Sequence, residues 1–358
     1  MRGDKMIECY NDRVMRNETE NIVKSYDFSF LKNSKVLVTG ATGLLGTHLA
    51  FAIAMANRLQ NLGLKLYLQY RNPEKALRIY GSEFLSREDI YPVTGNITDE
   101  LNLPEEPDYI FHTASPTSSR YFVTHPVETV LDAVNGTANV LKHGKNAKAA
   151  VYLSSLEVYG ICENETVNEQ SYGYIDYRNV RSSYSEGKRI CETLCTGYWK
   201  EYGVPVKTVR LSQTFGTGVE YGDGRVFAEF LRCAMEKRNI VLHTAGNTLR
   251  SYLDAADAVT GILTVAEKGE AGEVYNLSNP KTAISIREMA SAVAGFFPES
   301  GIDVITDIPE NLEGYGYNPE MKIILDIQKA EALGWHPQYD LSDMYKKMRD
   351  SILSRREQ

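Results

Sequence analysis

Cysteine, histidine and long apolar runs are all scarce in this 358-residue sequence. Its five cysteines are an odd number without the spacing of a disulfide framework, which indicates a reducing compartment, and we expect the cytoplasm. The six histidines form no HxxxH or CxxC-type set, so we expect no metal site. No apolar run is long enough to span a bilayer, and residues 1–30 are charged throughout, without the apolar core of a signal peptide. We therefore expect no membrane association.

Positive charge is also in deficit. The net charge of −8 argues against a general nucleic-acid-binding protein, although it leaves room for a local basic pocket that binds a phosphorylated ligand. Charged residues make up 24% of the chain and hydrophobic residues 43%, as in an ordinary globular protein. At this length the chain can bury a large core, either as one α/β unit or as two closely joined domains.

Short β-rich runs alternate with helical stretches over the first two thirds of the chain, which is typical of a parallel sheet flanked by helices. The predicted strands are residues 35–40, 64–70, 90–95, 108–115, 149–155 and 205–212. One predicted helix begins near Leu44, a last one begins near Leu341, and the others cover residues 127–145, 184–203, 224–237 and 285–297.

A glycine turn, VTGATGLLG, stands between the first predicted strand and its helix. Glycines at this spacing permit a tight turn and let a pyrophosphate approach the backbone at the helix N-terminus. A phosphate-binding P-loop is excluded because no Gly-Lys-Ser/Thr follows. The turn predicts a dinucleotide site, with a plain strand-turn-helix of small residues as the weaker alternative. The predicted cofactor contacts in it are Gly40, Thr42, Gly43, Leu44, Leu45 and Gly46.

The second predicted strand ends in Gln69-Tyr70-Arg71-Asn72 and lacks the acidic residue that would bind the ribose of NAD. Arg71 could hold the 2′-phosphate of NADP, or it could be a solvated loop arginine. The sequence therefore leaves NAD and NADP both open.

Tyr184 and Lys188 are four residues apart in SSYSEGKR, so they lie on one face of a predicted helix. Taken alone, the pair could be an exposed helix turn. Ser155, at the end of a predicted strand, adds a hydroxyl that could orient a substrate oxygen. A tyrosine has a pKa of about 10, which a lysine cation and an oxidised nicotinamide would lower. We therefore predict that Tyr184 is the base of a redox site, assisted by Lys188 and Ser155.

Several motifs resemble the extended short-chain dehydrogenase/reductases, and among them the nucleotide-sugar epimerases, dehydratases and decarboxylases. They run from about Lys35 to the last helix: TGATGLLG, HTASP, SSLEVYG, YSEGK, LRSYLDAADAV and LDIQKAEALGWHP. The resemblance implies that Tyr184, Lys188 and Ser155 take the Tyr/Lys/Ser roles. It also implies tightly bound NAD(P), a nucleoside-diphosphate sugar as substrate, and oxidation of a C4 hydroxyl to a 4-keto intermediate.

The resemblance implies an α/β fold, namely a Rossmann-type doubly wound parallel sheet with a smaller C-terminal α/β domain that binds substrate. We expect an N-terminal extension with one helix over residues 1–33 and an NAD(P)-binding domain over residues 34–212. Residues 213–358 are expected to be mainly the nucleotide-sugar-binding domain, with residues 250–278 returning to the Rossmann domain.

The remaining candidate site residues fall into two sets. Further predicted cofactor contacts are Asn96, Ile97, Thr113, Ala114 and Ser115. The predicted substrate contacts are Ser115, Pro116, Arg181, Gln213, Arg225, His243 and Arg250.

The stretches VRSSYSEGKRICETLC and DGRVFAEFL are most similar to UDP-glucuronate decarboxylases. Glu157 matches their acidic residue before Val-Tyr-Gly, and Arg181 and Arg250 match two of their arginines. Loss of CO2 from C5 requires a held carboxylate, for which arginines are suited. The alternatives are that Glu157 is a loop carboxylate paired with a nearby cation, and that Arg250 binds only the diphosphate.

Some positions depart from the family pattern. Leu156 replaces a polar residue of the decarboxylases and the acidic Asp of dTDP-glucose dehydratases, and Gln213 replaces the usual Asn near the diphosphate. Thr217 stands in place of Pro and Ala133 in place of Asn, while Lys322 lies where an arginine is usual. We expect decarboxylation or epimerisation. The alternatives are a 4,6-dehydratase with Glu157 as base, an NADP-linked ketosugar reductase and a non-catalytic NAD(P)-binding sensor.

Helices 127–145 and 184–203 carry more apolar residues than one sheet-facing stripe needs. The residues concerned are Val130, Val134, Ile190, Leu194 and Tyr198. Family members pair these helices across a two-fold axis, so we expect a homodimer.

Overall fold

The computed structural model describes residues 8–309 and 320–356. Its larger part is a seven-stranded sheet in the order β11-β7-β5-β4-β1-β2-β3, with every neighbouring pair parallel. The strands are β1 (Lys35–Thr39), β2 (Lys65–Tyr70), β3 (Ile90–Thr94), β4 (Tyr109–His112), β5 (Ala149–Ser155), β7 (Val206–Leu211) and β11 (Val274–Leu277). Strand order reverses between β1 and β4, as in a doubly wound Rossmann-type sheet, which confirms the predicted fold class.

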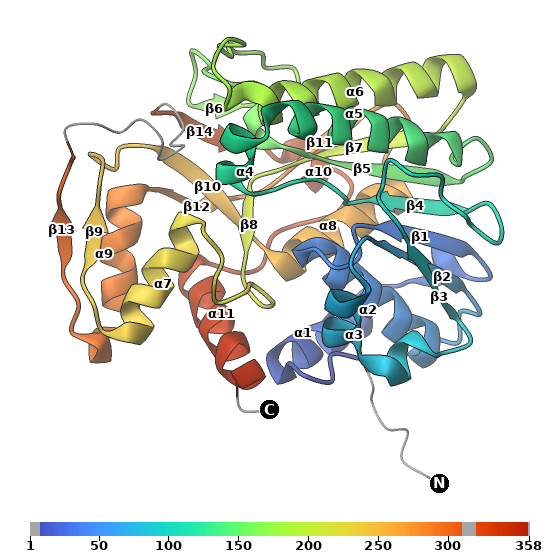
Figure 1. Ribbon diagram of the computed structural model, residues 1–358, viewed down its shortest axis with the longest axis horizontal. Helices are drawn as coiled ribbons and strands as arrows, with labels where there is room; N and C mark the ends of the chain where they lie inside the picture. Colours follow the sequence, from blue (N-terminus) through green and yellow to red (C-terminus); the bar gives the residue numbers. More distant parts are fainter. Residues whose placement is uncertain (1–7, 310–319, 357–358) are drawn as a thin grey trace, which may run out of the picture.

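Side chains of the central strands alternate between two apolar layers, one on each face of the sheet. Val36 and Val38 of β1 belong to the layer that contains α2 and α8, whereas Leu37 between them belongs to the layer that contains α5 and α6. The bounds of these helices are α2 Leu44–Leu59, α8 Ala255–Lys268, α5 Pro126–Lys142 and α6 Ser182–Tyr202. Figure 1 shows α5 and α6 side by side along one face of the sheet.

The second lobe is built around a five-stranded sheet in the order β12-β10-β14-β6, with β8 also paired to β10. Its strands are β6 (Thr166–Val167), β8 (Gln213–Phe215), β10 (Leu249–Asp254), β12 (Asn279–Ser285) and β14 (Lys322–Leu325). The pair β9 (Ile240–Leu242) and β13 (Val304–Thr306) and three helices complete the lobe: α7 (Val226–Glu236), α9 (Ile286–Phe296) and α11 (Leu341–Arg356). Its core is aromatic, because Phe215 stacks on Phe227 and contacts the edge of Tyr252 and Tyr345.

The structure adds elements that the sequence patterns did not predict. Helix α3 (Pro73–Leu85) follows β2, and Gly81 interrupts its helical geometry with a φ of 75°. The short helices α4 (Ser119–Thr124) and α10 (Gln328–Glu331) were also missed. No helix among the described residues is long and apolar enough to cross a membrane.

The N-terminal extension contains helix α1 (Arg13–Ser25), which contacts α2, α8 and α11. Figure 1 shows α1 and α11 together at the lower edge of the molecule. Asp12 caps α1 and also accepts a hydrogen bond from Ser351 of α11, 339 residues away in the sequence. The extension therefore joins the lobe of the seven-stranded sheet to the last helix of the chain.

A buried charge network lies at the centre of this junction. Glu18 of α1 pairs with Lys347 of α11, whose ammonium lies 2.8 Å from the carboxylate of Asp254 at the start of α8. Nε2 of His48 in α2 lies 3.5 Å from Glu18. Burial opposes ionisation of Glu18, but the charge of Lys347 and the contact with His48 lower the pKa of Glu18 overall. One lysine thus faces two buried acidic groups, and burial together with the charge of Glu18 raises the pKa of Asp254 to about 7 despite this lysine.

Replacing this lysine should destabilise the fold strongly. In Lys347→Met the carboxylates of Glu18 and Asp254 lose their cation, and breaking a buried ion pair costs about 3–5 kcal/mol. Urea unfolding followed by circular dichroism would measure the loss, with Lys346→Met as the matched control, because Lys346 is exposed on the same helix. Equal unfolding midpoints for the two variants would contradict this account of the junction.

Candidate active site

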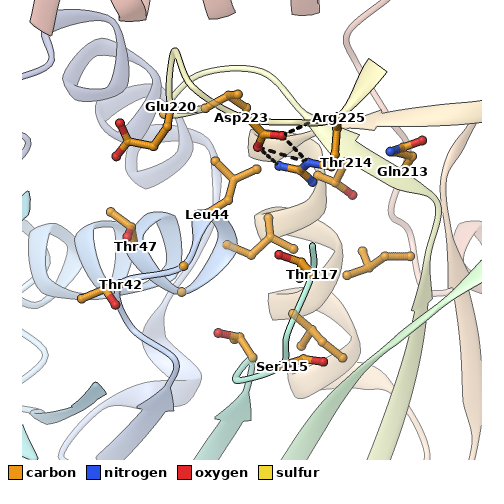
Figure 2. A pocket seen from close by; sticks show the side chains of 18 of the residues that line it. Thr42, Leu44, Thr47, Ser115, Thr117, Gln213, Thr214, Glu220, Asp223 and Arg225 are labelled. Atoms are coloured by element: carbon orange, nitrogen blue, oxygen red, sulfur yellow. Dashed lines mark hydrogen bonds and ion pairs between the residues drawn. The ribbon is translucent and has the colours of Figure 1, made fainter. Parts of the chain in front are cut away.

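A cavity of about 680 Å³ lies at the carboxyl ends of the central parallel strands, between the two lobes. This is the edge at which doubly wound sheets bind ligands, and the volume suits a small-molecule ligand. Figure 2 shows Thr42, Leu44 and Thr47 around the start of α2 on one side, and Gln213, Thr214 and Arg225 of the second lobe on the other. No group of three or more potential metal ligands is found within residues 8–309 and 320–356.

The glycine turn brings the N-terminus of α2 very close to the ends of β1 and β4. Gly40 has a φ of 62°, and a Cβ placed on it would lie 2.7 Å from Cα of Ala114. A Cβ on Gly46 would contact the carbonyl oxygen of Gly40 and would lie 2.9 Å from Oγ1 of Thr113. The backbone is therefore exposed at the positive end of the α2 dipole, which fits the pyrophosphate of a dinucleotide.

The structure brings most of the predicted cofactor residues to this cavity. Those that line it are Thr42, Gly43, Leu44, Leu45, Gly46, Thr113, Ser115, Tyr184 and Lys188. Gly40 and Ala114 form the packed turn beneath them.

Besides Gly40 and Ala114, three further predicted cofactor residues lie outside the cavity lining. Asn96 is held in a turn by Asp99, and Ile97 packs against Gly136 of α5. Arg71 is exposed beyond the end of β2. Their predicted contacts with a cofactor have no support in the lining of this cavity.

Ser155, Tyr184 and Lys188 converge on the cavity from the end of β5 and the first turns of α6. Nζ of Lys188 donates a hydrogen bond of 2.7 Å to the carbonyl oxygen of Leu153 and lies 5.9 Å from the centre of the Tyr184 ring. The ring of Tyr184 stacks on Phe122, with 4.3 Å between ring centres. These contacts fix the direction of the phenol and of the ammonium group.

Burial controls the protonation of the tyrosine and lysine. It raises the pKa of Tyr184 to about 12, with the charge of Glu157 adding to the shift and the Ser155 hydroxyl opposing it. Burial also lowers the pKa of Lys188 to about 8. At neutral pH Tyr184 is therefore a phenol that can donate a proton, and it becomes a base only where additional positive charge stabilises the phenolate.

Glu157 and Arg181 form an ion pair next to Tyr184. Nη2 of Arg181 lies 2.8 Å from Oε1 of Glu157, and Ser185 donates a 3.1 Å hydrogen bond to Oε2. Glu157 lines the cavity, whereas Arg181 is only 6% exposed and lies outside the lining, packed over Phe122. Nε and Nη1 of Arg181 are buried without a hydrogen-bond partner among the described residues, and its contact with the substrate stays a prediction.

The second lobe contributes polar residues to the other end of the cavity. Nε and Nη2 of Arg225 both donate hydrogen bonds to the carboxylate of Asp223, and Nη2 lies 2.6 Å from Oδ2. Figure 2 marks these contacts with dashed lines. Arg250 bonds to the side-chain oxygen of Gln213 at 3.2 Å. Arg250 forms no ion pair with a carboxylate of residues 8–309 or 320–356, and its buried Nε has no hydrogen-bond partner there.

Arg250 is thus the guanidinium in this part of the cavity that is available to an anionic ligand. Ser115, Gln213 and Arg225 line the cavity with it. The other predicted substrate residues, Pro116 and His243, lie outside the lining, and Nδ1 of His243 bonds to the carbonyl oxygen of Asp307.

Among the lining residues that sequence patterns missed are three groups from helices or segments without a predicted site residue. They are Asn11, Asp12 and Met15 of the extension, Lys75, Arg78 and Ile79 of α3, and Ile352, Arg355 and Arg356 of α11. The only signal for the second group is the basic spacing in RNPEKALR, which we did not connect with the cavity.

Comparison with known proteins places this geometry in a family. The sequence profile described as the NAD dependent epimerase/dehydratase family matches residues 36–278. The chain belongs to this family. It is therefore an enzyme of the extended short-chain dehydrogenase/reductase type, as the motifs predicted.

Curated relatives and solved structures agree with this placement. UDP-glucuronic acid decarboxylase 6 of Arabidopsis thaliana is 28% identical over 317 residues, which is 88% of this chain and 87% of that protein. UDP-glucuronic acid decarboxylase 1 of Danio rerio is 28% identical over 348 residues, which is 96% of this chain and 79% of that protein. An epimerase from Methanothermobacter thermautotrophicus has the same fold, with a TM-score of 0.76, 21% identity and coverage of 96% and 97% of the two chains.

Removing the hydroxyl group of Tyr184 should greatly slow the catalysed reaction without weakening nucleotide binding. For Tyr184→Phe we expect kcat to fall by roughly two or more orders of magnitude, because the proton-transfer group is lost, while nucleotide affinity stays close to that of the wild type. Steady-state kinetics and calorimetric titration would measure the two effects. Tyr172→Phe is the matched control, because Tyr172 is 81% exposed. Near-normal turnover of Tyr184→Phe would refute the assignment.

Proposed function

We propose that this family member modifies a nucleoside-diphosphate sugar through a 4-keto intermediate, with NAD(P) as the hydride carrier. The observation that carries the proposal is the convergence of Ser155, Tyr184 and Lys188 between the glycine turn and Arg250 in one cavity. A dinucleotide at the glycine turn and a diphosphate at Arg250 would enclose the Tyr184 phenol between them. The five free cysteines support the proposed cytoplasmic location.

The roles of the residues follow from their protonation and geometry. Tyr184 accepts the proton of the sugar C4 hydroxyl while the hydrogen on C4 leaves as a hydride. Ser155 donates a hydrogen bond to the same C4 oxygen. Lys188 stabilises the phenolate by its charge. A bound oxidised nicotinamide would supply the hydride acceptor and further positive charge. The resulting carbonyl stabilises negative charge that develops at C5 and makes substituents there labile.

For the next step we propose decarboxylation at C5. The proposal is supported by the curated relatives, which are named UDP-glucuronic acid decarboxylases and match 88% and 96% of this chain. Arg250 is the residue proposed to hold the carboxylate, because its charge has no acidic partner among the described residues. Glu157, which is oriented by Arg181 and Ser185, borders the same space.

Epimerisation of a neutral sugar is the second candidate. It is favoured by the charge balance of the cavity, since Arg181 is paired with Glu157 and Arg225 with Asp223. Arg250 alone would otherwise have to serve both a diphosphate and a carboxylate. Structures of similar fold include a UDP-glucose 4-epimerase from Thermotoga maritima with UDP-glucose, with a TM-score of 0.70, 20% identity and coverage of 90% and 99% of the two chains.

A product assay separates the two candidates. Incubation with UDP-glucuronate and NAD+ or NADP+ should yield UDP-pentose and CO2, and Arg250→Ala should lower this turnover more than tenfold while dinucleotide binding changes little. Arg13→Ala, an exposed arginine outside the cavity, is the control. If neither product forms while a neutral UDP- or CDP-hexose is converted, decarboxylation is wrong, and epimerisation or dehydration replaces it.

We further propose a homodimer in which α5 and α6 of two copies pair across a two-fold axis. Val127 and Leu131 on α5 and Ile190 on α6 are 62%, 51% and 42% exposed, although they are apolar. In Figure 1 these helices form one outer edge of the molecule. Val134 and Tyr198, which the sequence also suggested, instead pack against the core beneath.

Charge on this face should separate the subunits. The double variant Leu131→Asp/Ile190→Asp would place two carboxylates in an apolar interface, so we expect monomers at micromolar concentration, where the wild type is a dimer. Sedimentation velocity measures the change. Leu59→Asp is the control, because Leu59 is exposed at the end of α2, away from this face. A monomeric wild type would rule out the proposal.

A further inference from the structure

Helix α4 brings an aromatic ring directly against the reactive tyrosine. Phe122 is only 2% exposed, lines the cavity, and stacks on the ring of Tyr184 with 4.3 Å between the ring centres and 12° between the ring planes. Ser183, next to Tyr184 on α6, donates a 3.2 Å hydrogen bond to the carbonyl oxygen of Phe122. The backbone and the side chain of Phe122 are therefore both tied to the first turn of α6.

The guanidinium group of Arg181 packs against the same two rings. Its Cζ lies 4.8 Å from the centre of the Phe122 ring and 6.0 Å from the centre of the Tyr184 ring. A cation over an aromatic face is attracted by the quadrupole of the ring, and the attraction is stronger where water is excluded. Because Nε and Nη1 of Arg181 are buried without a hydrogen-bond partner among the described residues, contact with the rings contributes to holding this cation in place.

The position of Arg181 affects the charge that the phenol experiences. Burial is the largest of the causes that raise the pKa of Tyr184, and the charge of Glu157 adds to it, whereas the charge of Arg181 opposes both. Arg181 is also the partner of Glu157 in the 2.8 Å ion pair. The packing of Arg181 over the rings therefore helps to determine how readily Tyr184 releases its proton.

We propose that Phe122 is a positioning residue for proton transfer at Tyr184: its ring keeps the phenol in one orientation and keeps Arg181 beside it. Phe122 has no group that exchanges a proton, so it acts only through these neighbours. A ring stacked face to face blocks the swing of the Tyr184 side chain toward α4, which would carry its hydroxyl away from a substrate oxygen. A displacement of about 1 Å can cost on the order of 100-fold in rate. This inference rests on the proposed function, in which Tyr184 transfers the proton.

Ordinary core packing is the alternative role for a buried phenylalanine. Phe122, however, lies outside the four apolar clusters that form the core of residues 8–309 and 320–356. Its ring contacts are with the reactive tyrosine and a buried arginine. The next residue before it on α4, Tyr121, stacks instead on His125, with 4.6 Å between ring centres, and lies outside the cavity lining. The same short helix therefore offers a stacked ring that does not touch Tyr184.

The test is steady-state kinetics of the full-length protein with NAD+ and UDP-glucuronate, or with a neutral UDP- or CDP-hexose if the product assay selects one. Phe122→Leu should lower kcat roughly 10- to 100-fold, while KM and the dissociation constant of NAD+ change less than about threefold. Phe122→Tyr keeps the stacked ring and should stay within about threefold of the wild-type kcat. Tyr121→Leu, which removes the other stacked ring of α4, is the matched control and should keep the wild-type kcat.

A double variant shows whether Phe122 acts through Tyr184. In the Tyr184→Phe background, Phe122→Leu should lower the single-turnover rate by less than about twofold, because the hydroxyl that the stack positions is already absent. A role in folding alone would lower the rate by the same factor in both backgrounds. Thermal unfolding followed by circular dichroism checks that each variant is folded. Phe122→Met, which keeps most of the volume without the ring, takes the place of Phe122→Leu if that protein does not fold.

The outcomes that count against the positioning role differ from those that count against the proposed function. A near-normal kcat in Phe122→Leu overturns the role and leaves the proposed function standing. An equally large loss in Phe122→Tyr, or losses that multiply in the double variant, also overturns it, because the stack on the phenol is then not what matters. If the wild type converts none of these nucleotide sugars, the proposed function fails together with this inference.

Discussion

Close approach of the α2 N-terminus to the ends of β1 and β4 is the constraint on which the rest of the site depends. It is permitted because Gly40 and Gly46 carry no side chain, whereas a Cβ on Gly40 would lie 2.7 Å from Cα of Ala114. The approach places a helix dipole at the carboxyl edge of the sheet. Two strands away, β5 ends in Ser155, and α6 returns over the same edge with Tyr184 and Lys188. A dinucleotide held at the turn would thus lie beside the phenol.

Charge compensation then determines which groups remain for a ligand. Glu157 is paired with Arg181, and Asp223 with Arg225, so these arginines are largely neutralised by their partners. Arg250 of the second lobe and Lys75 and Arg78 of α3 have no such partner among the described residues. An acidic protein thereby presents positive charge at two ends of one cavity, which fits a pair of phosphorylated ligands that meet at Tyr184.

The sequence predicts the sheet and the central chemistry because both depend on local patterns. Buried parallel strands appear as apolar runs, the glycine spacing is contiguous, and Tyr184 and Lys188 share one helix face by their spacing. The remainder depends on long-range contacts. The pairing of Glu18 with Lys347 joins opposite ends of the chain, and Arg181 pairs with Glu157 while lying outside the cavity lining. Gly81 interrupts the periodicity by which α3 could have been recognised. Only the folded structure brings Lys75 and Arg78 to the cavity.

The central claim is that one cavity binds a pyridine dinucleotide and a nucleotide sugar on either side of Tyr184. Mass spectrometry of the ligands that co-purify with the native protein tests it most directly. The account predicts a pyridine dinucleotide in near-stoichiometric amount together with a nucleoside-diphosphate sugar, whose masses would also identify the sugar and the base. A protein that carries neither, and whose native mass does not change when NAD(P)+ and UDP-sugars are added, would contradict the account.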